Sequence, residues 1–254
     1  MTGFRAAICA AALLTAAGSA AAEPTHLVVR AIAKDAKFIG DAMGGVEITL
    51  TDARSGKRLG HGLTAGGTGD TRRLIVEPRV RGQALSTPEA ARFEATLDVT
   101  KPTLVRAEAK GPLGKPGAVI TVASEMWVLP GHDVGGDGWV LELPGLVVEP
   151  SSGTASDGTL QIAAKVTLMC GCPIEPGGHW DANQYEVKAT LLAKDGHAAG
   201  ETVLAYAGKP SQFAGTLPPP KGGDYRLVVT AHNASTGNSG VAETSFAIIE
   251  VNTR

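Results

Sequence analysis

Residues 160–170 read LQIAAKVTLMC, and this stretch decides the fold class. Every second position along it is apolar, at Leu160, Ile162, Ala164, Val166, Leu168 and Cys170. Successive side chains of a β-strand point to opposite faces of the sheet, so a spacing of two predicts a strand with one buried face. The same alternation returns at 46–51, 185–191 and 225–231. A chain built from such segments is expected to be all-β.

The rest of the chain supports this class. It contains 33 glycines and 15 prolines among 254 residues, and turn residues separate many short runs rich in Val, Ile, Leu and Thr. That composition is typical of β-sandwiches and barrels. Further strands are expected at 26–33, 57–64, 71–77, 93–99, 103–110, 118–129 and 138–149. One short helix is expected at 86–92, because Ser86 or Thr87 can cap it and Pro88 suits its first position.

The first 22 residues have the pattern of a secretory signal peptide. Arg5 supplies a positive charge, residues 6–16 form an apolar run, and Ala20 to Ala22 offer a small-residue cleavage site. An uncleaved membrane anchor needs a longer apolar run. We therefore expect a cleaved signal peptide at 1–22, which takes Cys9 with it, and a periplasmic or secreted mature protein.

The charge balance limits the partners that can be expected. The chain has 23 basic and 25 acidic residues, so removing Arg5 leaves 22 against 25, a formal charge of −3. A mildly negative chain is not expected to bind nucleic acid or to use a polybasic membrane contact. The mature sequence also has no further apolar run long enough to span a membrane.

A boundary is expected where the sequence reads EPSSG, at 149–153, because Pro, Ser and Gly are typical of linkers between domains. The sequence therefore predicts an N-terminal domain at 23–149 and a C-terminal domain at 150–254.

Two segments resemble known families. Residues 44–70, with the pattern Val-x-Ile-x-Leu-x-Asp, a Ser-Gly turn and the run GLTAGGTG at 62–69, resemble the transthyretin-like or collagen-adhesin B-type modules of exported bacterial proteins. Residues 225–251 resemble the last hairpin of bacterial immunoglobulin-like domains. These resemblances imply two tandem immunoglobulin-like β-sandwich domains, the first transthyretin-like, of the kind used as spacers or binding platforms. The inter-sheet disulfide of antibody domains is excluded, because the two cysteines left after export are near neighbours.

Those two cysteines are the strongest candidate for chemistry. Cys170 and Cys172 flank Gly171, Met169 precedes them, and His179 follows in the next loop. If the strand continues to Cys170, Met169 points away from it, so both can serve one ion only if the strand has ended or bulged. Two thiolates with a thioether and an imidazole form a soft ligand set, which favours Cu(I) over Zn(II). We expect the pair at the rim of the C-terminal sandwich, open to an ion or to another thiol.

The same pair allows other interpretations. In an oxidising compartment two close thiols readily form a disulfide, which can be redox-active or inert. The first hypothesis is an exported non-enzymatic protein that binds Cu(I) through Cys170, Cys172, Met169 and His179. The alternatives are a structural or interaction module of the bacterial envelope with a protein partner, and thiol–disulfide exchange at this pair.

Several other features have simpler explanations. The Asp/Gly segment at 132–138 suits a turn better than a Ca²⁺ site, because its spacing matches no calcium-binding repeat. Trp127 and Trp139 are expected to fill the first core, with a partner-binding patch as the other interpretation. The sequence has no serine-hydrolase or nucleotide-binding motif.

Overall fold

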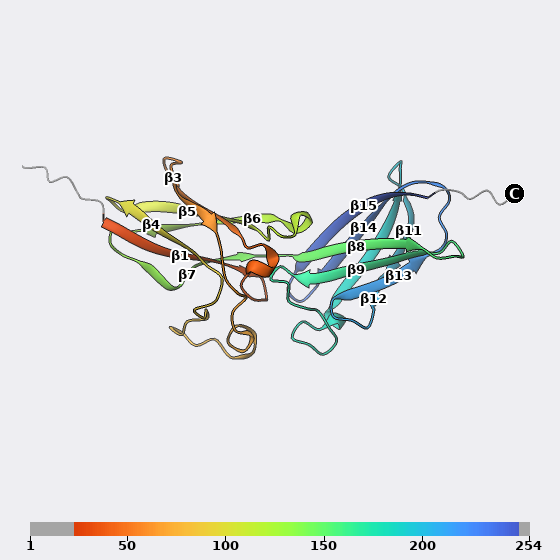
Figure 1. Ribbon diagram of the computed structural model, residues 1–254, viewed down its shortest axis with the longest axis horizontal. Helices are drawn as coiled ribbons and strands as arrows, with labels where there is room; N and C mark the ends of the chain where they lie inside the picture. Colours follow the sequence, from red (N-terminus) through yellow and green to blue (C-terminus); the bar gives the residue numbers. More distant parts are fainter. Residues whose placement is uncertain (1–22, 249–254) are drawn as a thin grey trace, which may run out of the picture.

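The computed structural model describes residues 23–248 and shows an elongated, all-β molecule (Figure 1). The expected signal peptide, 1–22, lies outside the described residues, as do residues 249–254. Strands up to Leu143 form one half of the molecule and strands from Leu146 onward form the other. Each half packs two sheets face to face, which confirms the all-β sandwich expectation.

The N-terminal half pairs a three-stranded sheet with a four-stranded one. The smaller sheet has the order β4-β1-β7, with β1 antiparallel to β4 and parallel to β7, and the larger has the order β3-β2-β5-β6. The strands are β1 (Glu23–Ala33), β2 (Glu47–Asp52), β3 (Arg58–Leu63), β4 (Phe93–Val99), β5 (Thr103–Gly111), β6 (Ile120–Val128) and β7 (Val134–Leu143).

The C-terminal half is built from two four-stranded antiparallel sheets, with the orders β12-β13-β9-β8 and β11-β10-β14-β15. If these strands are numbered 1 to 8 from β8 to β15, the two orders become 5-6-2-1 and 4-3-7-8. This is the Greek-key arrangement of immunoglobulin-like sandwiches. The strands are β8 (Leu146–Thr154), β9 (Leu160–Leu168), β10 (Tyr185–Ala193), β11 (Ala198–Val203), β12 (Ala205–Tyr206), β13 (Gln212–Leu217), β14 (Gly223–Asn233) and β15 (Asn238–Ile248).

Four short helical turns complete the described elements: η1 (Asp41–Met43), η2 (Arg72–Val76), η3 (Pro116–Ala118) and η4 (Ala182–Gln184). Two sequence predictions were wrong here. Residues 71–77 form the π-helical turn η2 instead of a strand, and residues 86–92 form turns and single bridges instead of a helix. Both segments belong to the long connection between β3 and β4, where contacts with β1 override local preference.

That connection, residues 64–92, covers the outer face of β1. Phe38, Leu74, Ala90 and Ile32 of β1 form a small second core beneath it. Arg30, also on β1, is buried; its Nη1 donates to the carbonyl oxygens of Ala90 and Ala91, while its Nε has no partner. Burial and the nearby Arg92 lower the Arg30 pKa. A buried guanidinium therefore fixes one end of the connection to the sheet.

Asp137, at the start of β7, fixes the same connection at a second point. Its carboxylate accepts the backbone N–H groups of Leu85 at 2.8 Å and Ser86 at 2.7 Å. Burial acts to raise the Asp137 pKa, but these two N–H groups and the Arg30 charge together lower it below its ordinary value.

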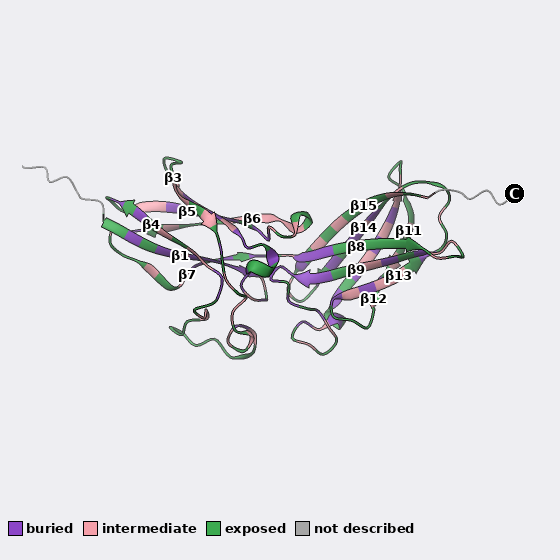
Figure 2. Cartoon of the chain, in the orientation of Figure 1, coloured by how far each residue is buried: buried purple, intermediate pink, exposed green. Residues whose placement is uncertain are grey.

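The main core follows the predicted alternation. The inward positions of β9, from Leu160 to Leu168, are buried, as are Val187 and Leu191 of β10 and Leu227 of β14 (Figure 2). These residues and the core of the N-terminal half belong to one continuous cluster of buried apolar side chains. The residues expected to form a linker, 149–153, lie inside β8, and the chain passes between the halves at Pro144 and Gly145. The division into domains at 149/150 stays a prediction.

The two halves are held together by a buried amide. The Asn238 side chain, at the start of β15, donates through Nδ2 to the Lys34 carbonyl at 3.0 Å and accepts the Gly145 N–H through Oδ1 at 3.0 Å. The Trp180 indole Nε1 also donates to the Asp35 carbonyl at 2.8 Å. Backbone groups of the N-terminal half thus depend on side chains of the C-terminal half for their hydrogen bonds.

Replacing Asn238 with Ala should lower the free energy of unfolding by roughly 2–3 kcal/mol, because it leaves the Lys34 carbonyl and the Gly145 N–H without partners. Urea unfolding measures this change. The control is Asn183→Ala, because the exposed Asn183 side chain bonds only to Asp181. Equal stability of the two variants would contradict the role assigned to Asn238.

Replacing Asp137 with Asn should cost about 1 kcal/mol at neutral pH and speed hydrogen exchange at the Leu85 and Ser86 amides. A carboxylate with a lowered folded-state pKa stabilises the fold above its unfolded pKa, about 3.9, and this contribution is lost as the pH falls through the folded value. The difference between wild type and variant should therefore shrink in acid. The control is Asp133→Asn, which removes the charge of a carboxylate that accepts only the His26 N–H, and in it the Leu85 and Ser86 amides should keep their protection.

Candidate functional site

The Cys170–Cys172 segment forms a tight turn at the end of β9. The strand ends at Leu168, and the Leu168 carbonyl accepts the Gly171 N–H at 2.8 Å. Gly171 has φ of +78°, a conformation that favours glycine. The two cysteines are joined by a disulfide. The structure therefore holds the oxidised pair, one of the alternatives that the sequence left open.

The expectation that these sulfurs are open to solvent was wrong. Cys170 is 3% exposed and Cys172 is 5% exposed, and Met169 is buried as well. The cause is the junction between the halves, which covers the end of β9. Because the strand ends at Leu168, side chains no longer alternate between its two faces at Met169 and Cys170, and both are buried.

His179 lies apart from this core. It is exposed, and its ring packs edge-on against Trp180 with the ring centroids 6.1 Å apart. No described contact joins His179 to a sulfur atom. Within residues 23–248, no three His, Cys, Asp or Glu side chains gather closely enough to hold a metal ion.

The structure brings one further sulfur to the turn that sequence reasoning missed. The Met43 Sδ lies 2.8 Å from where a Cβ would sit on Gly171, so any larger residue there would collide with it. Met43 belongs to η1 in the N-terminal half. Its thioether lies beside the turn that carries both cysteines, with Met169 next to them in the sequence. No local signal could reveal this neighbour, because 127 residues separate Met43 from Cys170.

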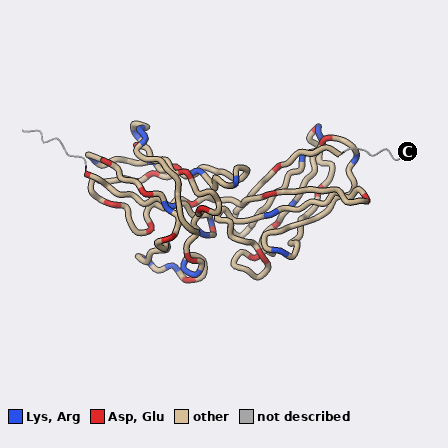
Figure 3. The backbone as a smooth tube through the Cα atoms, viewed as in Figure 1, with Lys and Arg blue, Asp and Glu red and all other residues tan. Residues whose placement is uncertain are grey.

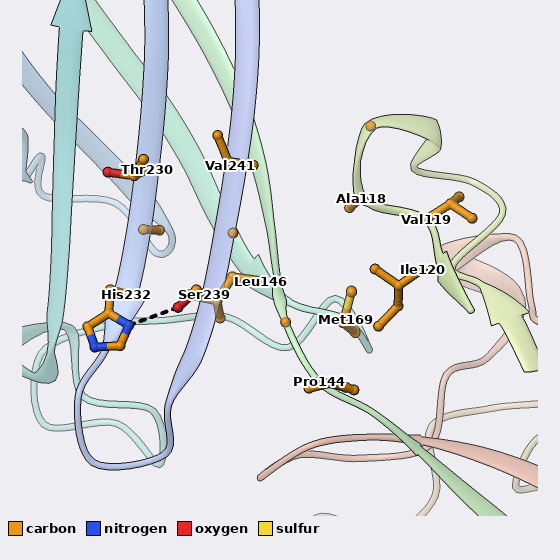
Figure 4. Close-up of a pocket in the computed structure, with 14 residues that line it drawn as sticks. Ala118, Val119, Ile120, Pro144, Leu146, Met169, Thr230, His232, Ser239 and Val241 are labelled. Carbon is orange, nitrogen blue, oxygen red and sulfur yellow. Dashed lines mark hydrogen bonds between the residues drawn. The ribbon is translucent and has the colours of Figure 1, made fainter. Parts of the chain in front are cut away.

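An apolar groove of about 450 Å³ opens at the same junction (Figure 4). One wall comes from η3 and the start of β6, the other from β14 and β15, and the β7–β8 connection and Met169 lie between them. The side chains that line it include Ile120, Pro144, Leu146, Met169, Thr230 and Val241, most of them apolar. Groups from both halves thus form a single concave surface, the usual setting of ligand sites between packed units.

One polar pair stands at the edge of this groove. The His232 Nδ1 and the Ser239 Oγ lie 2.9 Å apart on the neighbouring strands β14 and β15. The residues that line the groove include no Asp, Glu or Cys. The pair can give a bound chain a hydrogen-bond donor and an acceptor, but no lining carboxylate orients the imidazole as in a catalytic triad.

The other residues singled out from the sequence lie away from the cysteine turn. Trp139 is buried and donates to the Ser124 hydroxyl, as its expected core role requires. Trp127 is 51% exposed on the outer face of β6, so its core assignment was wrong. The Arg54 guanidinium lies over its ring, 5.1 Å from the centroid. The 132–138 segment was expected to be a turn, but residues 134–138 form the start of β7, and Asp133 and Asp137 both accept backbone N–H groups.

Comparisons with known proteins give no family. No protein-family model matches the sequence, and no curated protein matches it. Among solved structures, the chain is similar to the tip fimbrial protein Mfa3 from Porphyromonas gingivalis with C-terminal truncation, with a TM-score of 0.29 and 7% identity over 90% of this chain and 83% of that one. So low a TM-score supports no inference about function. Among the described residues, no helix has the length and apolar character needed to cross a membrane.

Copper binding stays a prediction, and it applies to the reduced protein. With the disulfide opened, the chain should bind about one Cu(I), and replacing both Cys170 and Cys172 with Ser should abolish binding. Met43→Leu should weaken binding severalfold if the thioether is a ligand, while Met126→Leu, a control on β6, should not. Competition with a chromogenic Cu(I) chelator under anaerobic conditions measures all four proteins. Equal binding by wild type and the double Ser variant would refute the hypothesis.

Proposed function

We propose that this protein is an exported, non-enzymatic interaction module that binds an extended segment of an envelope protein in the groove between its two halves. The observation that carries the proposal is the groove itself. It is apolar, it is open at Val241, which is 54% exposed, and side chains of both halves line it. Exposed apolar surface in a concave site is typical of binding surfaces.

The type of partner follows from the strands beside the groove. β6 is the last strand of the order β3-β2-β5-β6, and β15 is the last strand of β11-β10-β14-β15. The outermost strand of a sheet has backbone N–H and C=O groups on one side that no neighbouring strand takes up. At the groove β15 lies close against β8, since a Cβ on Gly240 would collide with the Leu146 carbonyl, which leaves β6 as the edge that a partner can join. An extended peptide can bond to such an edge while its alternate side chains enter apolar pockets. An extended chain therefore suits this groove better than a compact small molecule.

The junction favours a site that is formed before binding. The Asn238 and Trp180 hydrogen bonds fix the two walls, and the Lys115 ammonium adds an ion pair of 2.8 Å to Glu149 of β8. A preformed site avoids the entropy cost of ordering its own walls when a partner binds. Export rests on the signal-peptide pattern at 1–22, and the proposal places the partner in the same compartment.

A second candidate is Cu(I) binding by the reduced cysteines, because the Met43 thioether lies beside their turn and Met169 precedes it. Thiol–disulfide exchange has less support, since both sulfurs are buried and exchange requires access for an attacking thiolate.

A photo-crosslinking residue at position 241 tests the groove. It should capture one envelope protein in cells, whereas the same residue at position 203 should not. Val203 is a matched control, because it is also a solvent-exposed valine on the β11-β10-β14-β15 sheet but lies on β11, at the opposite edge. Capture from both positions would indicate non-specific contact and contradict the proposal.

The captured protein then allows an affinity measurement. Val241→Glu should weaken its binding at least tenfold, because a buried unpaired carboxylate is costly at an apolar interface, and Val203→Glu should leave it unchanged. Unchanged binding by the Val241 variant would refute the groove as the site.

A further inference from the structure

The connection between β3 and β4 presents an exposed tip that neither the fold nor the groove uses. Every residue from 76 to 84 is exposed, and this tip contains the run Arg79-Val80-Arg81. Val76 and Val80 are 54% and 61% exposed, among the most exposed large apolar side chains of the described residues. In Figure 3 the connection that includes the tip carries basic and acidic residues and projects away from the long axis of the molecule.

The base of this tip is fixed. Leu74 is buried in the second core, and the Arg73 Nη1 donates to the Ser86 carbonyl at 3.2 Å. Asp137 holds the following residues through the Leu85 and Ser86 amides. The folded scaffold therefore holds the two valines and the two arginines out in solvent instead of letting them pack against it.

The charge of this region is opposite to that of the whole chain. The tip, residues 76–84, contains two arginines, Arg79 and Arg81, and one acidic residue, Glu77, a formal charge of +1, whereas the full chain has −2. Glu77 forms an ion pair with Arg72 at 2.5 Å. Within residues 23–248, Arg79 and Arg81 have neither an ion-pair partner nor a side-chain hydrogen bond. The mildly negative total, which argued against a membrane contact, thus conceals a locally positive surface.

We infer that the tip, residues 76–84, docks reversibly on an anionic lipid surface. Guanidinium groups bind phosphate oxygens well, and basic residues are attracted to anionic headgroups. Apolar side chains between them enter the boundary between headgroups and acyl chains. A soluble polyanion would bind the arginines but gain nothing from the exposed valines. This inference uses a different surface from the groove and does not depend on the proposed function.

Vesicle co-sedimentation tests the inference with the chain beginning at Glu23. The protein should bind vesicles of phosphatidylcholine and phosphatidylglycerol mixed three to one, should not bind pure phosphatidylcholine, and should dissociate as salt is raised. Replacing Arg79 and Arg81 with Gln should reduce the partition coefficient about 25-fold, or about fivefold per charge. Replacing Lys57 and Arg58 with Gln removes the same charge from the β2–β3 turn, on the opposite side of the molecule, and should have little effect.

Val80→Ser separates a lipid surface from other anionic partners. It should reduce vesicle binding about threefold, because it removes apolar contact but no charge. The inference is wrong if the Arg79/Arg81 and Lys57/Arg58 variants bind equally, or if wild type does not bind the anionic vesicles. It is also wrong if Val80→Ser binds as wild type does, because the tip would then be a plain polyanion site. Urea unfolding should show all variants as stable as wild type, because these side chains are exposed.

Discussion

The placement of the two halves depends on one buried side chain. The Asn238 amide has one donor group and one acceptor oxygen engaged, and both partners, the Lys34 carbonyl and the Gly145 N–H, are backbone groups. Apolar packing alone tolerates small shifts, because it has no direction, whereas a buried amide is satisfied in few geometries. The continuous apolar core therefore supplies the attraction between the halves, and Asn238, aided by the Trp180 hydrogen bond and the Lys115–Glu149 ion pair, selects their relative position. The groove and the contact between Met43 and the cysteine turn exist only in that position.

The disulfide contributes to this junction mainly through local shape. It links residues two positions apart, so the loop that it closes is very short and removes little entropy from the unfolded chain. Its neighbours are more informative. Gly171 lies against Met43 of the other half, and Met169 lines the groove. The disulfide restrains the backbone of the turn that makes these contacts. This structural role is enough to explain two buried cysteines at this position without a catalytic one.

The sequence predicted the strands well wherever one face alternates. Residues 93–99 and the run from Leu160 are strands as expected, because a two-residue period is a local property. The failures have tertiary causes. The RRLIV segment at 72–76 has no alternation, and its conformation depends on a core shared with β1. The sequence placed the cysteines correctly at a strand end. Their burial and their contact with Met43 depend on the docking of the halves, which no local pattern encodes.

The groove and the basic tip differ in how binding there would affect the rest of the molecule. The groove has walls from both halves, so a partner that contacts Ile120 and Val241 together stabilises the docked arrangement by an amount that grows with its concentration relative to its Kd. The tip is attached through Arg30 and Asp137 to β1 and β7, and its contacts lie within the N-terminal half. Sites without shared partners contribute nearly independently to free energy. The same chain can therefore hold a partner at its junction while its tip contacts a surface, with neither event requiring a change in the other.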